Sequence, residues 1–291
     1  MNVRPDWNTD GQDWPNRETS RFVAAAGLRW HVQSMGNGPV LLLLHGTGAA
    51  THSWRDLMPR LARRFSVVAP DLPGHGFTEM PRAALLSMVE MGRQLGLLLR
   101  ALAVEPAYVV GHSAGAAVAM RMCLDGRIAP RALMSLNGAL LAPPGKSTAF
   151  FPLAARLIGG LPLVPSLLAR TAGDARIDGL LANTGSRIDP AGRRFYARLF
   201  RRPGHVAGAF GMMGHWDLAA LEPELGRLSP AVTLVAGEAD RMILPEAAQA
   251  AQRLIPGARV VRLPGLGHLA HEEQPVQVAG LIEEMADAAP A

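Results

Sequence analysis

Buried β-strands are the feature of this sequence that most restricts its fold. Residues 39–46 (PVLLLLHG) form a continuous apolar run without polar alternation, which is typical of a strand covered on both faces. Residues 65–71 (FSVVAPD) form a second buried run. Further strand patterns occur at 107–113, 131–138, 231–240 and 258–265. Residues 21–27 and 28–36 add two strands joined at Gly27, so we expect eight strands in all.

Segments with helical spacing separate most of these strands. The first of them, residues 53–64, has Ser53 as its predicted N-cap. Strands that alternate with helices predict an α/β fold in which a mostly parallel sheet carries helices on both faces.

The alternation stops after Gly138 and resumes at residue 231. The residues between are rich in Pro, Gly and Arg. We therefore expect residues 1–137 and 228–291 to form the core, and residues 138–227 to form an inserted helical cap.

The pentapeptide from Gly111 to Gly115 (GHSAG) follows a predicted strand and precedes a predicted helix. In this context a G-x-S-x-G motif forms a nucleophile elbow, a sharp turn that exposes the serine hydroxyl above the sheet. The two glycines would let strand and helix approach closely. A serine that only caps the helix is the alternative, but the context favours Ser113 as a nucleophile.

A serine nucleophile needs a base and a group that orients the base. Asp240 comes directly after a predicted strand, and His268 lies in a glycine-containing loop after the last strand. The order Ser, acid, His is that of the G-x-S-x-G hydrolases. We therefore expect a triad of Ser113, Asp240 and His268. Glu238 is the rival acid, and His271 is the rival base.

Two backbone N–H groups are candidates for an oxyanion hole. One belongs to Ala114, at the start of the helix after the nucleophile, and the other to Thr47 in the loop HGTG (residues 45–48). We expect His45, His75 and His112 to brace turns rather than to react.

Cysteine usage and hydropathy indicate the compartment. Cys123 is the single cysteine, which excludes an intramolecular disulfide and favours a reducing compartment. Residues 1–18 are polar and lack the apolar core of a signal peptide. No apolar run approaches the ~20 residues of a membrane-spanning helix. We expect a soluble cytoplasmic protein with at most peripheral membrane contact.

We expect neither a cofactor nor a resident metal. Residues 143–148 (PPGKST) contain Gly-Lys-Ser, but Leu140 stands where a phosphate loop requires Gly. The densest group of potential metal ligands is His268, His271, Glu272 and Glu273. This group lacks the H-E-x-x-H spacing, and His268 already has a predicted role.

The net charge of +5 is concentrated in one segment. Between Phe150 and Gly204 there are nine arginines and three acidic residues. This distribution indicates an anionic partner at one place and argues against nucleic-acid binding.

Five ordered motifs give the chain a family resemblance: HGTG, DLPGHG, GHSAG, GEAD and GLGHLAHEEQP. In this order they resemble the α/β-hydrolase fold family over about residues 21–285. A serine at the elbow excludes the branches with an aspartate nucleophile. Esterases, lipases, lactonases, carbon–carbon bond hydrolases and haloperoxidase-like members remain.

A narrower resemblance rests on phrases in the cap, because caps differ among these proteins while cores do not. NTGSRID (183–189) and YARLFRRPGHVAGAFGMM (196–213) are similar to the magnesium-chelatase accessory proteins of bacteriochlorophyll biosynthesis. This resemblance implies a role near magnesium insertion into protoporphyrin IX, without implying that this chain inserts the metal.

The cap allows three interpretations. Its apolar segment at 150–170 is a lid, a segment resting on a membrane surface, or the wall of a pocket for a flat macrocycle. In the third case arginines on the rim would pair with propionates. The candidates are Arg193, Arg194, Arg198, Arg201 and Arg202. The plain alternative is that these arginines form a solvated helix face.

The motifs therefore predict a serine hydrolase that acts on an apolar small molecule or a tetrapyrrole, and the narrower resemblance implies that it acts in bacteriochlorophyll biosynthesis. A non-catalytic accessory protein that binds or delivers a tetrapyrrole to magnesium-chelatase subunits is one alternative. A general esterase or lactonase is another. We expect the protein in the cytoplasm, with possible peripheral contact at the photosynthetic membrane.

Overall fold

The computed structural model describes residues 4–142 and 163–290. The PPGKST segment (143–148) and the apolar cap residues 150–162 lie outside the described residues.

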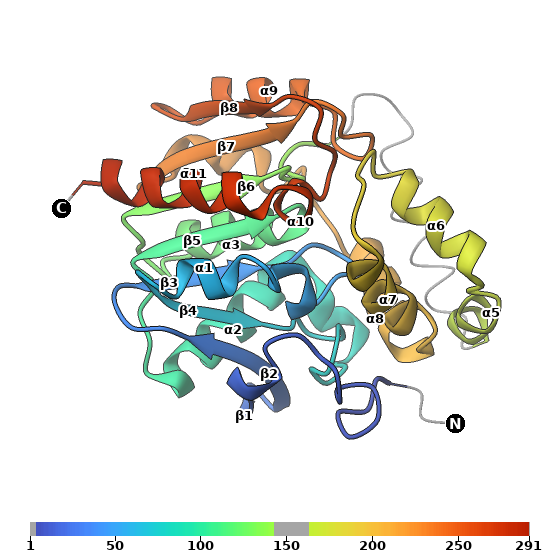
Figure 1. Cartoon of the computed structure of the whole chain (residues 1–291). Helices are drawn as coiled ribbons and strands as arrows, with labels where there is room; N and C mark the ends of the chain where they lie inside the picture. The colour runs from blue at the N-terminus through green and yellow to red at the C-terminus, as the bar shows by residue number, and fades with distance from the viewer. Residues whose placement is uncertain (1–3, 143–162, 291) are drawn as a thin grey trace.

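An eight-stranded mixed sheet forms the centre of the molecule, in the order β1-β2-β4-β3-β5-β6-β7-β8 (Figure 1). The strands are β1 (Ser20–Ala25), β2 (Leu28–Met35), β3 (Val40–Leu44), β4 (Ser66–Pro70), β5 (Tyr108–His112), β6 (Ala132–Leu136), β7 (Ala231–Gly237) and β8 (Arg259–Leu263). β2 pairs antiparallel with β1 and β4, and the remaining pairs are parallel. The predicted eight-stranded, mostly parallel sheet is confirmed.

Helices cover both faces of the sheet (Figure 1). α2 (Met88–Leu102), α3 (Ala114–Leu124) and α9 (Glu246–Leu254) pack on one face, and α1 (Met58–Leu61) and α11 (Pro275–Ala288) on the other. In β3, Leu42 and Leu44 join the first core, while Leu41 and Leu43 join the second. Both faces of β3 are therefore buried, which explains its lack of polar alternation.

The prediction of a helix that begins at Ser53 and runs to residue 64 is wrong, because the α-helix in this region comprises only Met58–Leu61. A 3₁₀ turn, η2 (Thr51–Trp54), precedes the short α1, and Ser53 does not act as a cap. Its hydroxyl instead bonds the ring of His271, 2.6 Å away. A long-range polar contact thus replaces the local one that the spacing suggested.

Within the described residues between β6 and β7 there are four α-helices, which we call the cap helices: α5 (Val164–Arg170), α6 (Asp174–Ala182), α7 (Pro190–Phe200) and α8 (Pro203–Gly214). They lie beyond the carboxyl ends of the parallel strands (Figure 1). The remaining short elements are η1 (Arg17–Thr19), η3 (Ala83–Leu86), η5 (Glu222–Arg227) and α10 (Ala270–Glu273). Within residues 4–142 and 163–290, no helix has the length and apolar character needed to cross a membrane.

Helix α3 lies unusually close to the sheet because its first turn carries Gly115. A Cβ on Gly115 would stand 2.2 Å from the carbonyl oxygen of Leu44 in β3. A Cβ on Gly111, at the end of β5, would stand 2.4 Å from the Cα of Ala116. Both glycines of the GHSAG motif are thus required by backbone packing, as the sequence predicted.

We expect Gly115→Ala to lower the free energy of unfolding by about 1–3 kcal/mol, because the new methyl group meets backbone that cannot move aside. Urea denaturation measures the change. Gly280→Ala in α11 is the matched control, since nothing lies within 4 Å of the Cβ it would add. It should raise stability by roughly 0.5–1 kcal/mol. Equal stability of the two variants would contradict the packing argument.

Candidate functional site

Ser113 occupies the sharp turn between β5 and α3. Its backbone has φ 50° and ψ −118°, a positive-φ conformation that non-glycine residues rarely adopt. The turn is held by Ser113 N–H, which donates to the carbonyl oxygen of Leu136 at 2.9 Å. The side chain is half-buried. A strained serine at a strand–helix turn is the backbone geometry of a nucleophile elbow.

Asp240 and His268 are brought together by the loops that follow β7 and β8. His268 Nδ1 lies 2.8 Å from Asp240 Oδ2. The other carboxylate oxygen accepts the N–H groups of Met242, at 2.7 Å, and Ile243, at 3.0 Å. Because a carboxylate only accepts, Nδ1 of His268 carries the proton and Nε2 is left free to act as a base.

His268 lies beside the elbow. Its carbonyl oxygen accepts a hydrogen bond from Nε2 of His112, the residue before Ser113, at 2.8 Å. The two imidazole rings are 4.8 Å apart. No hydrogen bond joins Ser113 Oγ to His268 in the described part of the chain. The structure therefore joins Asp240 to His268, and it places His268 against His112, the residue that precedes Ser113.

The HGTG loop lies against the elbow on its other side. A Cβ on Gly46 would stand 3.0 Å from Cβ of Ser113. Ala114 begins α3, so its N–H has no acceptor within the helix. Within the described ranges, Thr47 N–H also donates to no protein group. Both N–H groups expected for an oxyanion hole are thus unused at the elbow.

His45 braces this loop, as the sequence predicted. Its Nε2 accepts the N–H of Leu72 at 2.9 Å, so its Nδ1 carries the proton and donates to the carbonyl oxygen of Gly46 at 2.8 Å. Burial lowers the pKa of His45, which keeps the ring neutral. The peptide between Gly46 and Thr47 is therefore fixed, and with it the direction of Thr47 N–H.

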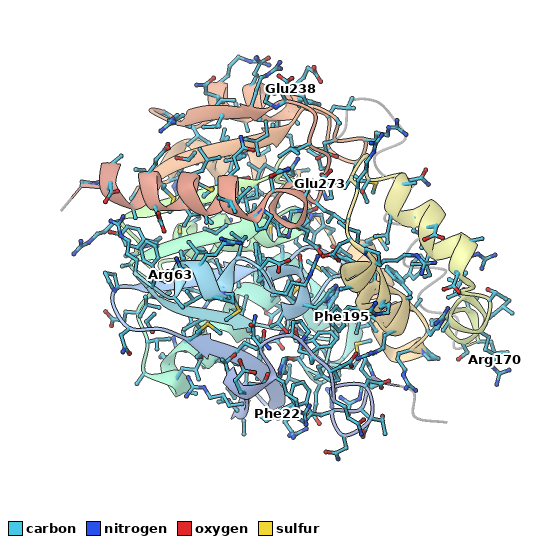
Figure 2. All side chains as sticks on the ribbon, viewed as in Figure 1. Phe22, Arg63, Arg170, Phe195, Glu238 and Glu273 are labelled. Atoms are coloured by element: carbon cyan, nitrogen blue, oxygen red, sulfur yellow. The ribbon has the colours of Figure 1, made fainter. Side chains whose placement is uncertain are left out.

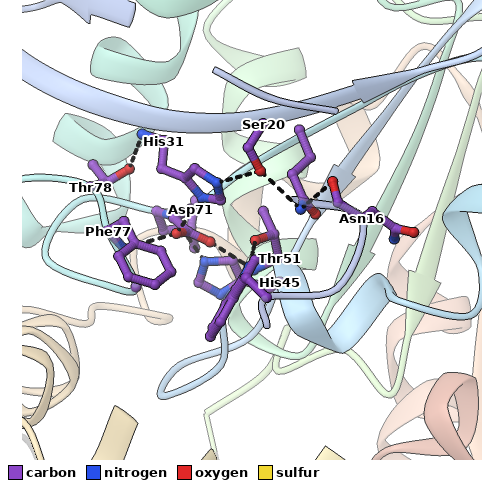
Figure 3. Close-up of polar contacts among 12 residues, drawn as sticks. Asn16, Ser20, His31, His45, Thr51, Asp71, Phe77 and Thr78 are labelled. Atoms are coloured by element: carbon purple, nitrogen blue, oxygen red, sulfur yellow. Dashed lines mark hydrogen bonds and ion pairs between the residues drawn. The ribbon is translucent and has the colours of Figure 1, made fainter. Parts of the chain in front are cut away.

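A buried carboxylate anchors the end of the same loop (Figure 3). Asp71 accepts the N–H of Thr51 at 2.7 Å and the N–H of Phe77 at 2.9 Å, and it lies 2.8 Å from Nδ1 of His31. Burial alone would raise the pKa of Asp71, but His31 and the N–H donors outweigh it and hold the pKa well below its usual range. A charged Asp71 thus joins the loops after β3 and β4 to β2.

The two rivals named from the sequence are engaged elsewhere. His271 bonds Ser53, and its neighbour Glu272 accepts the hydroxyl of Tyr196 from α7 at 2.6 Å. Glu238 is exposed at the edge of the sheet beside β8 (Figure 2), where its carboxylate lies 3.7 Å from Arg262. Neither Glu238 nor His271 contacts Asp240 or His268 through a hydrogen bond among the described residues.

Three residues that support the site were not identified from the sequence. Asn137 Nδ2 donates to Asp240 Oδ2 at 2.8 Å. Ser186, in the cap loop after α6, accepts the N–H of Leu269 at 2.8 Å. Glu273, labelled beside α10 in Figure 2, accepts the N–H of Gly267 at 2.8 Å. The phrase NTGSRID contains Ser186, but nothing local indicates the contact.

The five cap arginines gather in one place. A groove of about 450 Å³ is lined by Arg193, Arg194, Arg198, Arg201 and Arg202, together with Asp10, Asp174 and Ala197. Ser113, Asp240 and His268, the three residues of the predicted triad, do not line it. The arginines therefore share a groove separate from the elbow, on the side of α7 that faces the N-terminal segment and α6.

Most of these arginines are paired with carboxylates. Arg193 bonds Asp178, Arg198 bonds Asp13, Arg201 bonds Asp174 and Arg202 bonds Asp10. Hydrogen bonds from Arg198 and Arg193 lower the pKa values of Asp13 and Asp178. Arg194 is exposed and has no ion pair within residues 4–142 and 163–290.

The potential metal ligands at 268–273, from which we expected no metal site, point to different partners. His268 bonds Asp240, His271 bonds Ser53, and Glu273 bonds backbone N–H groups. In the part of the chain that the structure describes, no group of three or more His, Cys, Asp or Glu side chains could hold a metal ion.

Comparison with known proteins identifies the family of this chain. The family model described as "Alpha/beta hydrolase family" matches residues 41–281. A protein of Rhodobacter capsulatus named "Magnesium-chelatase 30 kDa subunit" is 39% identical over 273 residues, which cover 93% of this chain and 95% of that protein.

Solved structures share the fold. An alpha/beta hydrolase fold protein from Burkholderia ambifaria superposes with a TM-score of 0.78 at 26% identity, covering 91% of this chain and 97% of the other. A thermophilic esterase from Thermogutta terrifontis gives a TM-score of 0.72 at 23% identity, covering 92% and 98%. This chain has the α/β-hydrolase fold, belongs to the alpha/beta hydrolase family, and is a homologue of the magnesium-chelatase 30 kDa subunit.

Proposed function

We propose that this protein is a serine hydrolase with Ser113, His268 and Asp240 as its catalytic triad. The observation that carries the proposal is the hydrogen bond between His268 Nδ1 and Asp240 beside a strained Ser113. The carboxylate fixes the tautomer that leaves Nε2 available as a base. Membership of the alpha/beta hydrolase family supports this assignment.

The reaction would be acyl transfer in two steps. Ser113 Oγ attacks the carbonyl carbon of an ester while His268 Nε2 takes its proton, and the N–H groups of Thr47 and Ala114 hold the oxyanion. The bond to the leaving alcohol breaks as His268 returns the proton to it. Water then attacks the acyl-enzyme, with His268 again as base, and releases the acid and free Ser113.

The biological setting we propose is bacteriochlorophyll biosynthesis, near magnesium insertion into protoporphyrin IX. Homology to a magnesium-chelatase subunit supports this setting and an association with the chelatase. We place the protein in the cytoplasm, with peripheral contact at the photosynthetic membrane through the cap.

A second candidate function is tetrapyrrole binding in the arginine groove. The observation that favours it is the gathering of five guanidinium groups around one cavity of about 450 Å³. Planar guanidinium groups suit carboxylates such as propionates. The aspartates that now pair with Arg193, Arg198 and Arg201 are more than half exposed, so these pairs are weak and a ligand carboxylate could replace them.

We expect a fluorophosphonate probe to label the wild-type protein, and Ser113→Ala to reduce labelling by at least about 1,000-fold, because the proposed nucleophilic hydroxyl is lost. Intact-mass spectrometry measures the adduct. Ser53→Ala, which removes a buried serine whose hydroxyl bonds the ring of His271, is the control and should still be labelled. A folded wild type that does not react would refute the hydrolase mechanism.

Complementation separates hydrolysis from the accessory role. Ser113→Ala should fail to restore pigment synthesis in a strain that lacks the homologous subunit. Full rescue by this variant would make hydrolysis unnecessary for the biological role, and would favour the accessory protein.

The arginine groove makes a separate prediction. The double variant Arg194→Gln/Arg201→Gln should weaken binding of protoporphyrin IX by about tenfold, because two guanidinium partners of its propionates are lost. Tryptophan fluorescence quenching measures the affinity. The control is Arg100→Gln/Arg253→Gln, two exposed arginines outside the groove. Equal affinity for protoporphyrin IX and its dimethyl ester would contradict propionate recognition.

A further inference from the structure

A histidine of the cap holds two loops of the core. His205, in α8, is fully buried. Its Nδ1 accepts the N–H of Gly76, in the loop after β4, at 3.1 Å. Its Nε2 lies 3.0 Å from the carbonyl oxygen of Gly48, the last residue of the HGTG loop. One side chain from the insertion thus joins the loops that follow β3 and β4.

The protonation state of His205 follows from its partners. An N–H group points at Nδ1, so this nitrogen is unprotonated, and Nε2 carries the proton that it donates to Gly48. Burial lowers the pKa of His205 to about 4, although the bond to Gly48 opposes the shift. At neutral pH the ring is therefore a single neutral tautomer with both nitrogens in use.

The Gly48 carbonyl belongs to a tight turn around Thr47. Ala49 N–H donates to the carbonyl oxygen of Gly46 at 3.2 Å, which closes a four-residue turn. Gly48 has φ +78°, a conformation that favours glycine at the third position of such a turn. His45 bonds the carbonyl oxygen of Gly46, the residue before Thr47, and His205 bonds the carbonyl oxygen of Gly48, the residue after it. The two histidines fix the turn from opposite ends.

The position of His205 is set by close packing of α8. A Cβ on Gly208 would stand 2.0 Å from the carbonyl oxygen of Gly74, so the helix lies directly on the loop after β4. Met212, one turn further, accepts a hydrogen bond from Thr47 Oγ1 at 3.3 Å. The helix therefore touches the HGTG loop at two of its residues, and cannot shift without moving the loop.

We propose that His205 is a positioning residue for the oxyanion hole, so that the site is completed by cap helix α8. By holding the carbonyl of Gly48, it keeps Thr47 N–H directed at the space above Ser113. The inference rests on the proposed hydrolase function, because it assigns Thr47 N–H the stabilisation of negative charge in the transition state.

The test compares two substitutions that differ in reach. His205→Asn can still accept from Gly76 but is too short to donate to Gly48, whereas His205→Gln can reach Gly48. His205→Phe keeps an aromatic ring but loses both the donor to Gly48 and the acceptor for Gly76, which provides a second disrupted variant. The matched control is His215→Asn at the end of the same helix, where Nδ1 bonds only the carbonyl of Gly211 among the described residues.

The readout is the fluorophosphonate reaction, in which Ser113 Oγ bonds phosphorus, fluoride leaves and His268 takes the serine proton. We measure the maximal rate, the half-saturating probe concentration and the final labelled fraction on folded protein. His205→Asn and His205→Phe should lower the maximal rate by about tenfold, less than the ~100-fold or more for loss of an oxyanion donor. The half-saturating concentration and the final labelled fraction should not change. His205→Gln should recover most of the rate, and His215→Asn should match the wild type.

The outcomes are distinguishable. An unlabelled wild type overturns the proposed hydrolase, and this inference with it. A labelled wild type with His205→Asn and His205→Phe at the same maximal rate overturns the inference alone. The inference is also overturned if the His205 variants react at the wild-type rate but with a smaller labelled fraction. That result would indicate a loss of folded protein and not a misdirected Thr47 N–H.

Discussion

The close contact between the first turn of α3 and β3 is the constraint on which the site depends. Gly115 lies against the carbonyl of Leu44, and Gly111 lies against Ala116. With no side chain between them, the chain must reverse within one residue, which places Ser113 at a positive φ. The same contact brings the loop after β3 beside the elbow, so the packing of α3 on β3 positions both the proposed nucleophile and the proposed oxyanion donors.

The sequence predicted those parts of the molecule whose signals are local. Apolar runs such as 39–46 predict strands because both faces of β3 are buried. Asp240 and His268 could be selected because each follows a strand of a parallel sheet, and carboxyl ends of parallel strands meet at one edge. Their side chains are indeed joined by a hydrogen bond. The first helix was misplaced, because the hydroxyl of Ser53 finds a partner far away in sequence.

The supporting contacts could not be predicted, because they join segments that no local pattern relates. Ser186 lies 83 residues from its partner Leu269, and Asn137 lies 103 residues from Asp240. The arginines illustrate the same limit. Their spacing predicts one shared helix face, but Asp13, which pairs with Arg198, is 185 residues away. Whether that face lies near Ser113 or lines a separate groove depends on how α7 packs against the core, and residue spacing does not determine this packing.

The docking of α7 also relates the two proposed functions. Its inner side supplies Tyr196, which bonds Glu272 behind the His268 loop. Its outer side supplies the arginines of the groove. Hydrolysis and anion binding therefore draw on different residues of one helix, so neither function excludes the other by competing for a side chain. Substitutions on the outer side can remove binding while the polar network around Glu272, and with it the His268 loop, stays in place.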